Sequence, residues 1–138
     1  MIHKFKQANN AVLFAAGSCW EGVDFPGDMV SSLIIVRLPF PVPDPLSEAE
    51  REQYPSLQDY IRAVIIPDMQ VKLRQGFGRA IRTETDTCVI SVLDHRAAPG
   101  ERYYQAVLEA LPNLRITRKI KEVEEFIRAK KSSDYFLS

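Results

Sequence analysis

The stretch SLIIVRL at residues 32–38 decides the fold class of this chain. It is short, rich in branched apolar residues and apolar on both faces, and Pro39 ends it. Two more runs share this character, AVLFAA at residues 11–16 and TCVISVL at residues 87–93. Such runs are typical of strands in a parallel sheet that is covered by helices on both sides.

Helical patterns lie between and after these strands, and the alternation predicts an α/β fold. Ser47 and Glu50 have the spacing of a capping box for a first helix, and Ser56 is expected to cap a second. Pro67 is expected to interrupt that second helix and to start a new one. The predicted helices are 48–54, one through Asp59 to Ile66, 67–82, 100–111 and 119–131, and a weaker strand is predicted at 115–117.

The segment at residues 38–46 has four prolines in nine residues, which excludes a central strand or a helix. We expect it to form a stiff, extended surface loop. In parallel α/β sheets, ligands bind outside the carboxyl ends of the strands. The stretches directly after Ala16, Leu38 and Leu93 are therefore the regions where function is expected.

Composition limits the class of protein. The chain has 138 residues, which suit one compact domain, and 18 basic against 18 acidic residues. With no net charge, any contact with nucleic acid must come from a local patch. The longest apolar runs are far below the ~20 residues that span a bilayer. Cys19 and Cys88 lack a CxxC spacing, which argues against a zinc site, an iron–sulfur cluster or a disulfide within this chain. We expect a cytoplasmic or nucleoid-associated protein.

The first candidate motif is GSCWEGVDFPG at residues 17–27. Its three glycines free the backbone to approach a ligand closely. Glu21 and Asp24 bring acidic acceptors to the same turn, where they could meet a ribose hydroxyl or an arginine. The alternative is a strand-to-loop corner that Trp20 and Phe25 pin in the core.

The second candidate motif is QGFGRAIR at residues 75–82. Gln75, Arg79 and Arg82 share one helix face, which Lys72 extends, and two arginines and an amide on one face suit a multiply charged phosphate. Two glycines in a helix cost roughly 1 kcal/mol each against alanine, and this cost favours a functional role. The alternative is an ordinary solvated polar face. The opposite face is apolar and is expected to hold the helix to the sheet through Leu73, Phe77, Ala80 and Ile81.

These segments resemble the signatures of one family. Residues 17–27 are similar to motif V of the XPD/DinG-like superfamily 2 DNA helicases, and residues 75–82 are similar to their motif VI, QxxGRxxR. The segment LPFPVP at residues 38–43 resembles the family's LPFPxP stretch, and Asp94–Arg96 matches its D-x-R ending after the next strand. One departure is Cys19, where the family usually has phenylalanine. The signatures occur in family order and cover residues 11–96.

The resemblance implies a RecA-like three-layer α/β/α sandwich, with residues 1–138 forming the C-terminal part of a second motor domain. It implies ATP-driven translocation on single-stranded DNA, and it makes Arg79 and Arg82 the arginines that reach the γ-phosphate of ATP. It assigns the nucleotide-facing roles to Gln75, Glu21, Gly22 and Asp24. It assigns contacts with the DNA backbone to Gly17 and Ser18.

The family's P-loop and DExH motifs have no counterpart in these 138 residues. We therefore expect ATP and Mg²⁺ to be held mainly by a first RecA-like domain of the same full-length protein, and an iron–sulfur cluster, where present, to lie there too. The expected partners are that domain and single-stranded DNA, with no membrane, and the isolated chain is expected to be inactive. Two alternatives stay open: a non-catalytic RecA-like module that binds nucleic acid or a protein partner, and a helicase that acts on RNA.

Overall fold

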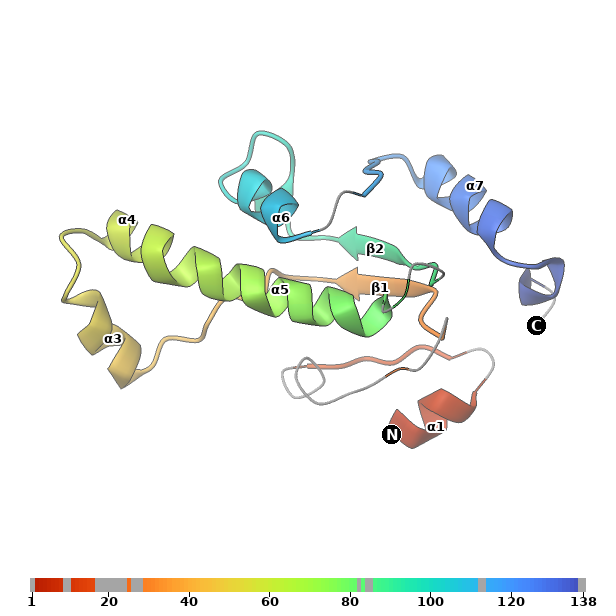
Figure 1. The fold of residues 1–138 in the computed structure, drawn as a ribbon, viewed down its shortest axis with the longest axis horizontal. Helices are drawn as coiled ribbons and strands as arrows, with labels where there is room; N and C mark the ends of the chain where they lie inside the picture. Colours follow the sequence, from red (N-terminus) through yellow and green to blue (C-terminus); the bar gives the residue numbers. More distant parts are fainter. Residues whose placement is uncertain are drawn as a thin grey trace. The chain divides into compact units, whose positions relative to one another are not determined.

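The structure is a computed structural model, and it describes residues 2–8, 11–16, 25, 29–81, 83, 86–111 and 114–136. Helices and strands alternate along these residues, as expected of an α/β fold (Figure 1). In chain order they are α1 (Ile2–Gln7), β1 (Ser32–Ile35), α3 (Pro45–Arg51), α4 (Leu57–Tyr60), the π-helical turn η1 (Ile61–Ile65), α5 (Ile66–Ala80), β2 (Val89–Val92), the 3₁₀ turn η2 (His95–Ala97), α6 (Tyr104–Ala110), α7 (Ile120–Lys130) and the 3₁₀ turn η3 (Ser133–Phe136).

The two strands pair in parallel. The N–H of Val89 donates to the carbonyl of Ser31 at 3.0 Å, and the N–H of Leu93 donates to the carbonyl of Ile35 at 2.9 Å. Both bonds join residues with the same separation in sequence, and the two arrows point the same way in Figure 1. The predicted strands at 32–38 and 87–93 are therefore confirmed, although both are shorter than expected.

β1 ends at Ile35 because the backbone groups that follow form hydrogen bonds outside the sheet. The N–H of Leu38 donates to a carboxylate oxygen of Asp94 at 3.0 Å. Pro39 has no N–H, and the N–H of Phe40 turns back to the carbonyl of Leu38 at 2.8 Å. The predicted proline-rich loop is confirmed as far as Asp44, after which α3 begins.

The cap of α3 differs from the predicted one. Asp44 is the N-cap: its Oδ1 accepts from the N–H of Ser47 at 2.7 Å, and the Ser47 hydroxyl accepts from the N–H of Asp44 at 2.9 Å. The predicted capping box of Ser47 and Glu50 is wrong, because Pro45 suits the first turn and lets the helix start three residues earlier. The predicted cap of α4 is confirmed, since the Ser56 hydroxyl accepts from the N–H of Asp59 at 3.1 Å.

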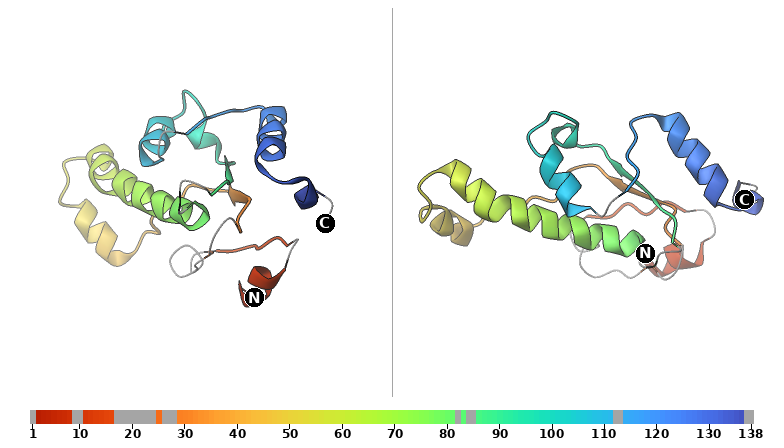
Figure 2. Two further views of the ribbon diagram at one scale, coloured as in Figure 1. Left: turned by 45° about the vertical axis from the view of Figure 1, so that its right-hand side comes forward. Right: turned by 45° about the horizontal axis from the view of Figure 1, so that its top comes forward.

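The prediction that Pro67 interrupts the helix is wrong. α4, η1 and α5 run on without a break, as Figure 2 shows. A proline inside a helix lacks an N–H, and its ring collides with the carbonyl four residues earlier. Here the wider π turn comes directly before it, and the N–H of Ile66 donates to the carbonyl of Ile61 instead. The π turn thus lets the chain pass the proline and still form one long helix.

α6 starts at Tyr104, four residues later than predicted for the helix at 100–111. Pro99 and Gly100 occupy the centre of a turn that the N–H of Glu101 closes on the carbonyl of Ala98 at 2.9 Å. Gly100 has a φ of 85°, as the third position of a type II turn requires. This turn delays the helix.

The predicted strands at 11–16 and 115–117 are wrong, because neither segment has regular secondary structure. Val12 and Phe14 are 79% and 89% exposed. A strand needs a neighbour to complete its ladder of hydrogen bonds. In the part of the chain that the structure describes, no strand pairs with either segment.

The chain forms two compact units. Unit 1 comprises Met1–Leu33, Gly76–Ser91 and Asn113–Ser138, and unit 2 comprises Ile34–Gln75 and Val92–Pro112. The buried apolar side chains of unit 2 are Ile35, Leu38, Tyr60, Met69, Leu73, Tyr103, Ala106, Val107 and Ala110. None of the helices that the structure describes is long and apolar enough to cross a membrane.

Candidate functional site

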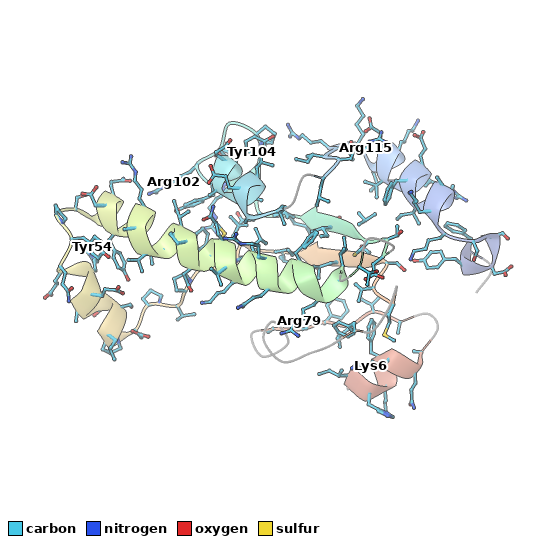
Figure 3. All side chains as sticks on the ribbon, in the orientation of Figure 1. Lys6, Tyr54, Arg79, Arg102, Tyr104 and Arg115 are labelled. Atoms are coloured by element: carbon cyan, nitrogen blue, oxygen red, sulfur yellow. The ribbon has the colours of Figure 1, made fainter. Side chains whose placement is uncertain are left out.

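The helix α5 carries the described part of the second motif. Gln75 is exposed and Arg79 is half-buried, and their separation of four residues puts them on one face of the helix. Figure 3 shows Arg79 near the end of α5. The apolar face is buried as predicted, with exposed fractions of 0% for Leu73, 9% for Phe77 and 4% for Ala80. The predicted apolar face is therefore confirmed for Leu73, Phe77 and Ala80, whereas Ile81 is half-buried and follows the end of the helix.

Lys72, which was expected to extend the basic face, is engaged within the helix. Its ammonium lies 3.0 Å from a carboxylate oxygen of Asp68, one turn earlier. Both side chains are about one-third exposed, so the pair is a surface ion pair of modest strength. This pairing reduces the positive charge of the face at that end.

The two glycines of the motif lie in different surroundings. Gly76 is buried, whereas Gly78 is exposed, and a Cβ atom built on Gly78 would meet nothing within 4 Å. No contact within the described chain therefore requires a glycine at position 78. Among the described residues, nothing prevents a ligand or another protein segment from approaching the backbone at Gly78 closely.

The other predicted site residues all lie outside the described residues. These are Gly17, Ser18, Glu21, Gly22, Asp24 and Arg82. From the first motif the structure describes Phe25, which is half-buried and lies edge-on to Phe5, with ring centroids 5.6 Å apart. Lys6 lies over the same ring at 5.9 Å. For the alternative, a corner that Trp20 and Phe25 pin in the core, the described residues thus offer the contacts of Phe25 with Phe5 and Lys6 of α1.

The D-x-R segment after β2 forms an ion pair at the carboxyl end of the strands. The Arg96 guanidinium donates to Asp94 through Nε at 2.9 Å and through Nη2 at 2.7 Å, so the pair is bidentate. Asp94 also accepts from two main-chain N–H groups, that of Leu38 at 3.0 Å and that of Arg96 at 3.1 Å. The Asp94 side chain is 4% exposed and that of Arg96 is 40% exposed.

Two aromatic rings extend this ion pair. The Arg96 guanidinium lies over the ring of Phe40 at 4.8 Å, and Phe40 packs against Tyr103 with centroids 4.8 Å apart. The N–H of Tyr103 donates to the carbonyl of Arg96 at 3.1 Å. We call the set of Leu38, Phe40, Asp94, Arg96 and Tyr103 the carboxyl-edge clasp. It joins the loop after β1 to the loop after β2 and to the start of α6.

The clasp sets the charge state of its acid. The hydrogen bond from Arg96 holds the pKa of the Asp94 carboxyl well below its usual range, and the N–H of Leu38 adds to this effect against the opposing cost of burial. The same bond raises the pKa of Arg96 above its ordinary value. Both groups are therefore charged at neutral pH, and their charges largely cancel.

The sequence identified Asp94–Arg96 only by its resemblance to the D-x-R ending, and it did not predict that Asp94 is buried and bound to Leu38. The available signal was an acid at the end of an apolar strand with an arginine two residues later. An acid in that position, next to a loop with several prolines, is well placed to satisfy the free N–H groups.

Comparisons with known proteins agree on one family. Residues 1–114 match the family described as the helicase C-terminal domain. The ATP-dependent DNA helicase YoaA of Haemophilus influenzae is 38% identical over 133 residues, which cover 94% of this chain and 20% of that protein. The 3′-5′ exonuclease DinG of Bacillus subtilis is 35% identical over 134 residues, 95% of this chain and 14% of that protein.

A third relative, the ATP-dependent DNA helicase DinG of Photobacterium profundum, is 38% identical over 109 residues, 78% of this chain and 16% of that protein. The chain thus spans one fifth or less of the length of these three relatives. No solved structure matches the chain. All the predicted site residues lie within the part that the family matches.

Proposed function

The chain belongs to the family of helicase C-terminal domains, as found in DinG- and YoaA-like ATP-dependent helicases, and from this premise we propose that it is the C-terminal part of a second RecA-like motor domain. In the complete helicase it completes an ATP site whose other half lies in a first motor domain. Hydrolysis at that site drives movement along single-stranded DNA and its unwinding.

Arg79 and Arg82 are the catalytic arginines of this proposal. Arg79 lies on the face of α5 that carries Gln75, opposite the buried side chains of Leu73 and Phe77, whereas Arg82 lies outside the described residues. The observation that carries the proposal is this division of the helix, since its apolar face is fixed in the protein while Gln75 faces solvent. An arginine fork placed at a transferring phosphoryl group offsets the charge that builds up on it, which is worth about 10³–10⁵ in rate in related hydrolases.

The remaining roles follow the first motif. Glu21, Gly22 and Asp24 act with Gln75 on the nucleotide, and Gly17 and Ser18 contact the DNA backbone. Mg²⁺ and the phosphates of ATP are held mainly by the first motor domain. Closure of the two domains over ATP and their reopening after hydrolysis move the protein along the strand in a hinge-type cycle.

The test is ATP turnover by the complete helicase, which also contains the P-loop domain. Arg82→Ala and Arg79→Ala are each expected to lower DNA-stimulated turnover by about 10³-fold or more. Arg79→Lys keeps the charge but loses the planar fork, so it should recover only a small part of the activity. Arg74→Ala is the matched control, because Arg74 is an exposed arginine on another face of α5.

Thermal unfolding of each variant separates a catalytic loss from a folding defect. Turnover at the wild-type level in a folded Arg82→Ala helicase would refute the catalytic role. If the 138-residue chain alone bound single-stranded DNA at submicromolar concentration and in a salt-sensitive manner, a non-catalytic binding module would become the better assignment. Competition between DNA and RNA in stimulating turnover would show which nucleic acid the helicase uses.

A further inference from the structure

An open hollow of about 420 Å³ lies at the carboxyl ends of the two strands. All six of its lining residues belong to unit 2 and come directly after β1 or at and after the end of β2. They are Val36, Arg37, Leu93, Asp94, His95 and Arg96. This is the edge at which parallel α/β sheets bind ligands, and none of the roles proposed above uses it.

The hollow has an excess of positive charge. Arg37 and His95 are exposed, and within the described residues neither side chain makes a hydrogen bond or an ion pair. Asp94 is the acid in the lining, but Arg96 pairs with it through two hydrogen bonds, at 2.9 and 2.7 Å. The guanidinium fork of Arg37 is therefore available to an anion, with the imidazole of His95 as a second donor.

Apolar side chains flank Arg37 and His95. Val36 is 65% exposed and Leu93 is 63% exposed, so both present apolar surface to the hollow. A cation next to exposed apolar surface matches a nucleotide unit of a single strand, whose phosphate is charged and whose sugar and base are largely apolar on their faces. A free inorganic anion would make no use of the apolar part.

The base of the hollow is held in place. Asp94 is fixed by four hydrogen bonds, from Leu38 and from the side chain and main chain of Arg96. The Arg96 guanidinium is further held over Phe40 at 4.8 Å. The two loops that carry Arg37 and His95 are thus joined before any ligand arrives, which lowers the ordering cost of binding.

We propose that this hollow binds a backbone phosphate of single-stranded DNA through Arg37 and His95, with the adjoining sugar and base against Val36 and Leu93. The inference rests on the proposed function, because it adds a DNA contact to the same motor. It assigns this contact to the edge of the sheet after β1 and β2, in addition to the contacts proposed for Gly17 and Ser18.

The test titrates the 138-residue chain with decathymidylate and follows the backbone amide signals and the Arg37 Nε signal by nuclear magnetic resonance. Signals of residues 36–38 and 93–96 should shift, with a Kd of about 10⁻⁴ M at physiological salt. Arg37→Gln should raise the Kd about 3- to 10-fold and reduce the slope of log affinity against log salt by about 1. His95→Gln should raise the Kd by a smaller factor.

Arg51→Gln is the matched control, since Arg51 is an exposed arginine of the same unit on α3. The proposal is overturned if decathymidylate leaves these signals unchanged, if Arg37→Gln binds like the wild type, or if Arg51→Gln weakens binding equally. Parallel titrations with inorganic phosphate and with ATP identify the source of the phosphate. Shifts with either of them but not with decathymidylate also overturn it.

The outcome is separable from that of the proposed function. If decathymidylate does not bind here but turnover in the complete helicase depends on Arg82, the motor assignment stands without this site. If turnover does not depend on Arg82 but decathymidylate binding depends on Arg37, the hollow stands and the catalytic assignment fails.

Discussion

The main-chain N–H of Leu38 donates a hydrogen bond of 3.0 Å to Oδ2 of Asp94, which lies 56 residues later in the chain. This bond joins the third residue after β1 to the second residue after β2. Leu38 and Asp94 are both buried, at 4% and 8% exposure, so an unpaired N–H or carboxylate here would be costly. The bond explains why β1 ends where it does. It also fixes the start of the loop with four prolines, because Leu38 is the first residue of that loop.

We predict that Arg96→Ala lowers the free energy of unfolding of the chain by about 2–4 kcal/mol. The substitution leaves the buried Asp94 carboxylate with two main-chain N–H donors and no opposite charge. It also removes the guanidinium from the ring of Phe40. Urea unfolding followed by circular dichroism measures the change.

Arg128→Ala is the control for this experiment. Arg128 pairs with Glu124 at 2.9 Å, a distance like that in the clasp, but both side chains are 61% exposed. Its loss should cost under about 1 kcal/mol. Equal effects of the two substitutions would show that burial of Asp94 does not determine the strength of the clasp.

A second prediction concerns pH. The pKa of Asp94 is lowered in the folded chain, chiefly by its hydrogen bond from Arg96. An acid with a lowered folded pKa stabilises the fold fully above its unfolded pKa of about 3.9, and this stabilisation is lost as the pH falls further toward the folded value. The free energy of unfolding should therefore be insensitive to Asp94 near neutrality and should fall below about pH 4.

Asp94→Asn isolates this effect, because asparagine does not titrate. Glu122 also has a lowered pKa, through hydrogen bonds from Thr117 and Lys119, so the wild type must be compared with the variant at each pH. The difference in free energy of unfolding between the two proteins should shrink as the pH falls below about 4. A difference that stays constant down to the lowest pH studied would contradict the lowered pKa.

Local patterns in the sequence were sufficient for the strands at β1 and β2 and for the two faces of α5. The family match confirms the resemblance and the RecA-like α/β fold. The long helix was harder to predict, because a proline such as Pro67 normally ends a helix. The π turn at Ile61–Ile65, which accommodates this proline, has no recognisable pattern in the sequence.

The clasp could not be predicted from the sequence, for a different reason. It depends on a contact between Leu38 and Asp94 across 56 residues, and spacing rules describe only neighbours in the chain. Of the predicted site residues, Gln75 and Arg79 lie on α5 as the helical spacing required. The predicted strand at 11–16 failed because a strand also needs a partner, which hydrophobicity alone does not supply.

The last prediction concerns Gly78, where stability and activity should move in opposite directions. Gly78→Ala should raise the free energy of unfolding of the chain by about 0.5–1 kcal/mol, because alanine is the better helix former. The new methyl group meets nothing within 4 Å in the described chain, so no steric cost offsets this gain. In the complete helicase the same methyl group would stand between α5 and whatever closes on it, and DNA-stimulated ATP turnover should fall.

Glu125→Ala on α7 is the control, because Glu125 is exposed and glutamate is already a good helix former. It should change the free energy of unfolding by at most a few tenths of a kcal/mol and leave turnover unchanged. A stabilised Gly78→Ala helicase with full turnover would mean that no ligand or domain approaches the backbone there. A destabilised chain would instead mean that position 78 has a neighbour of its own, and the glycine would then be a packing requirement.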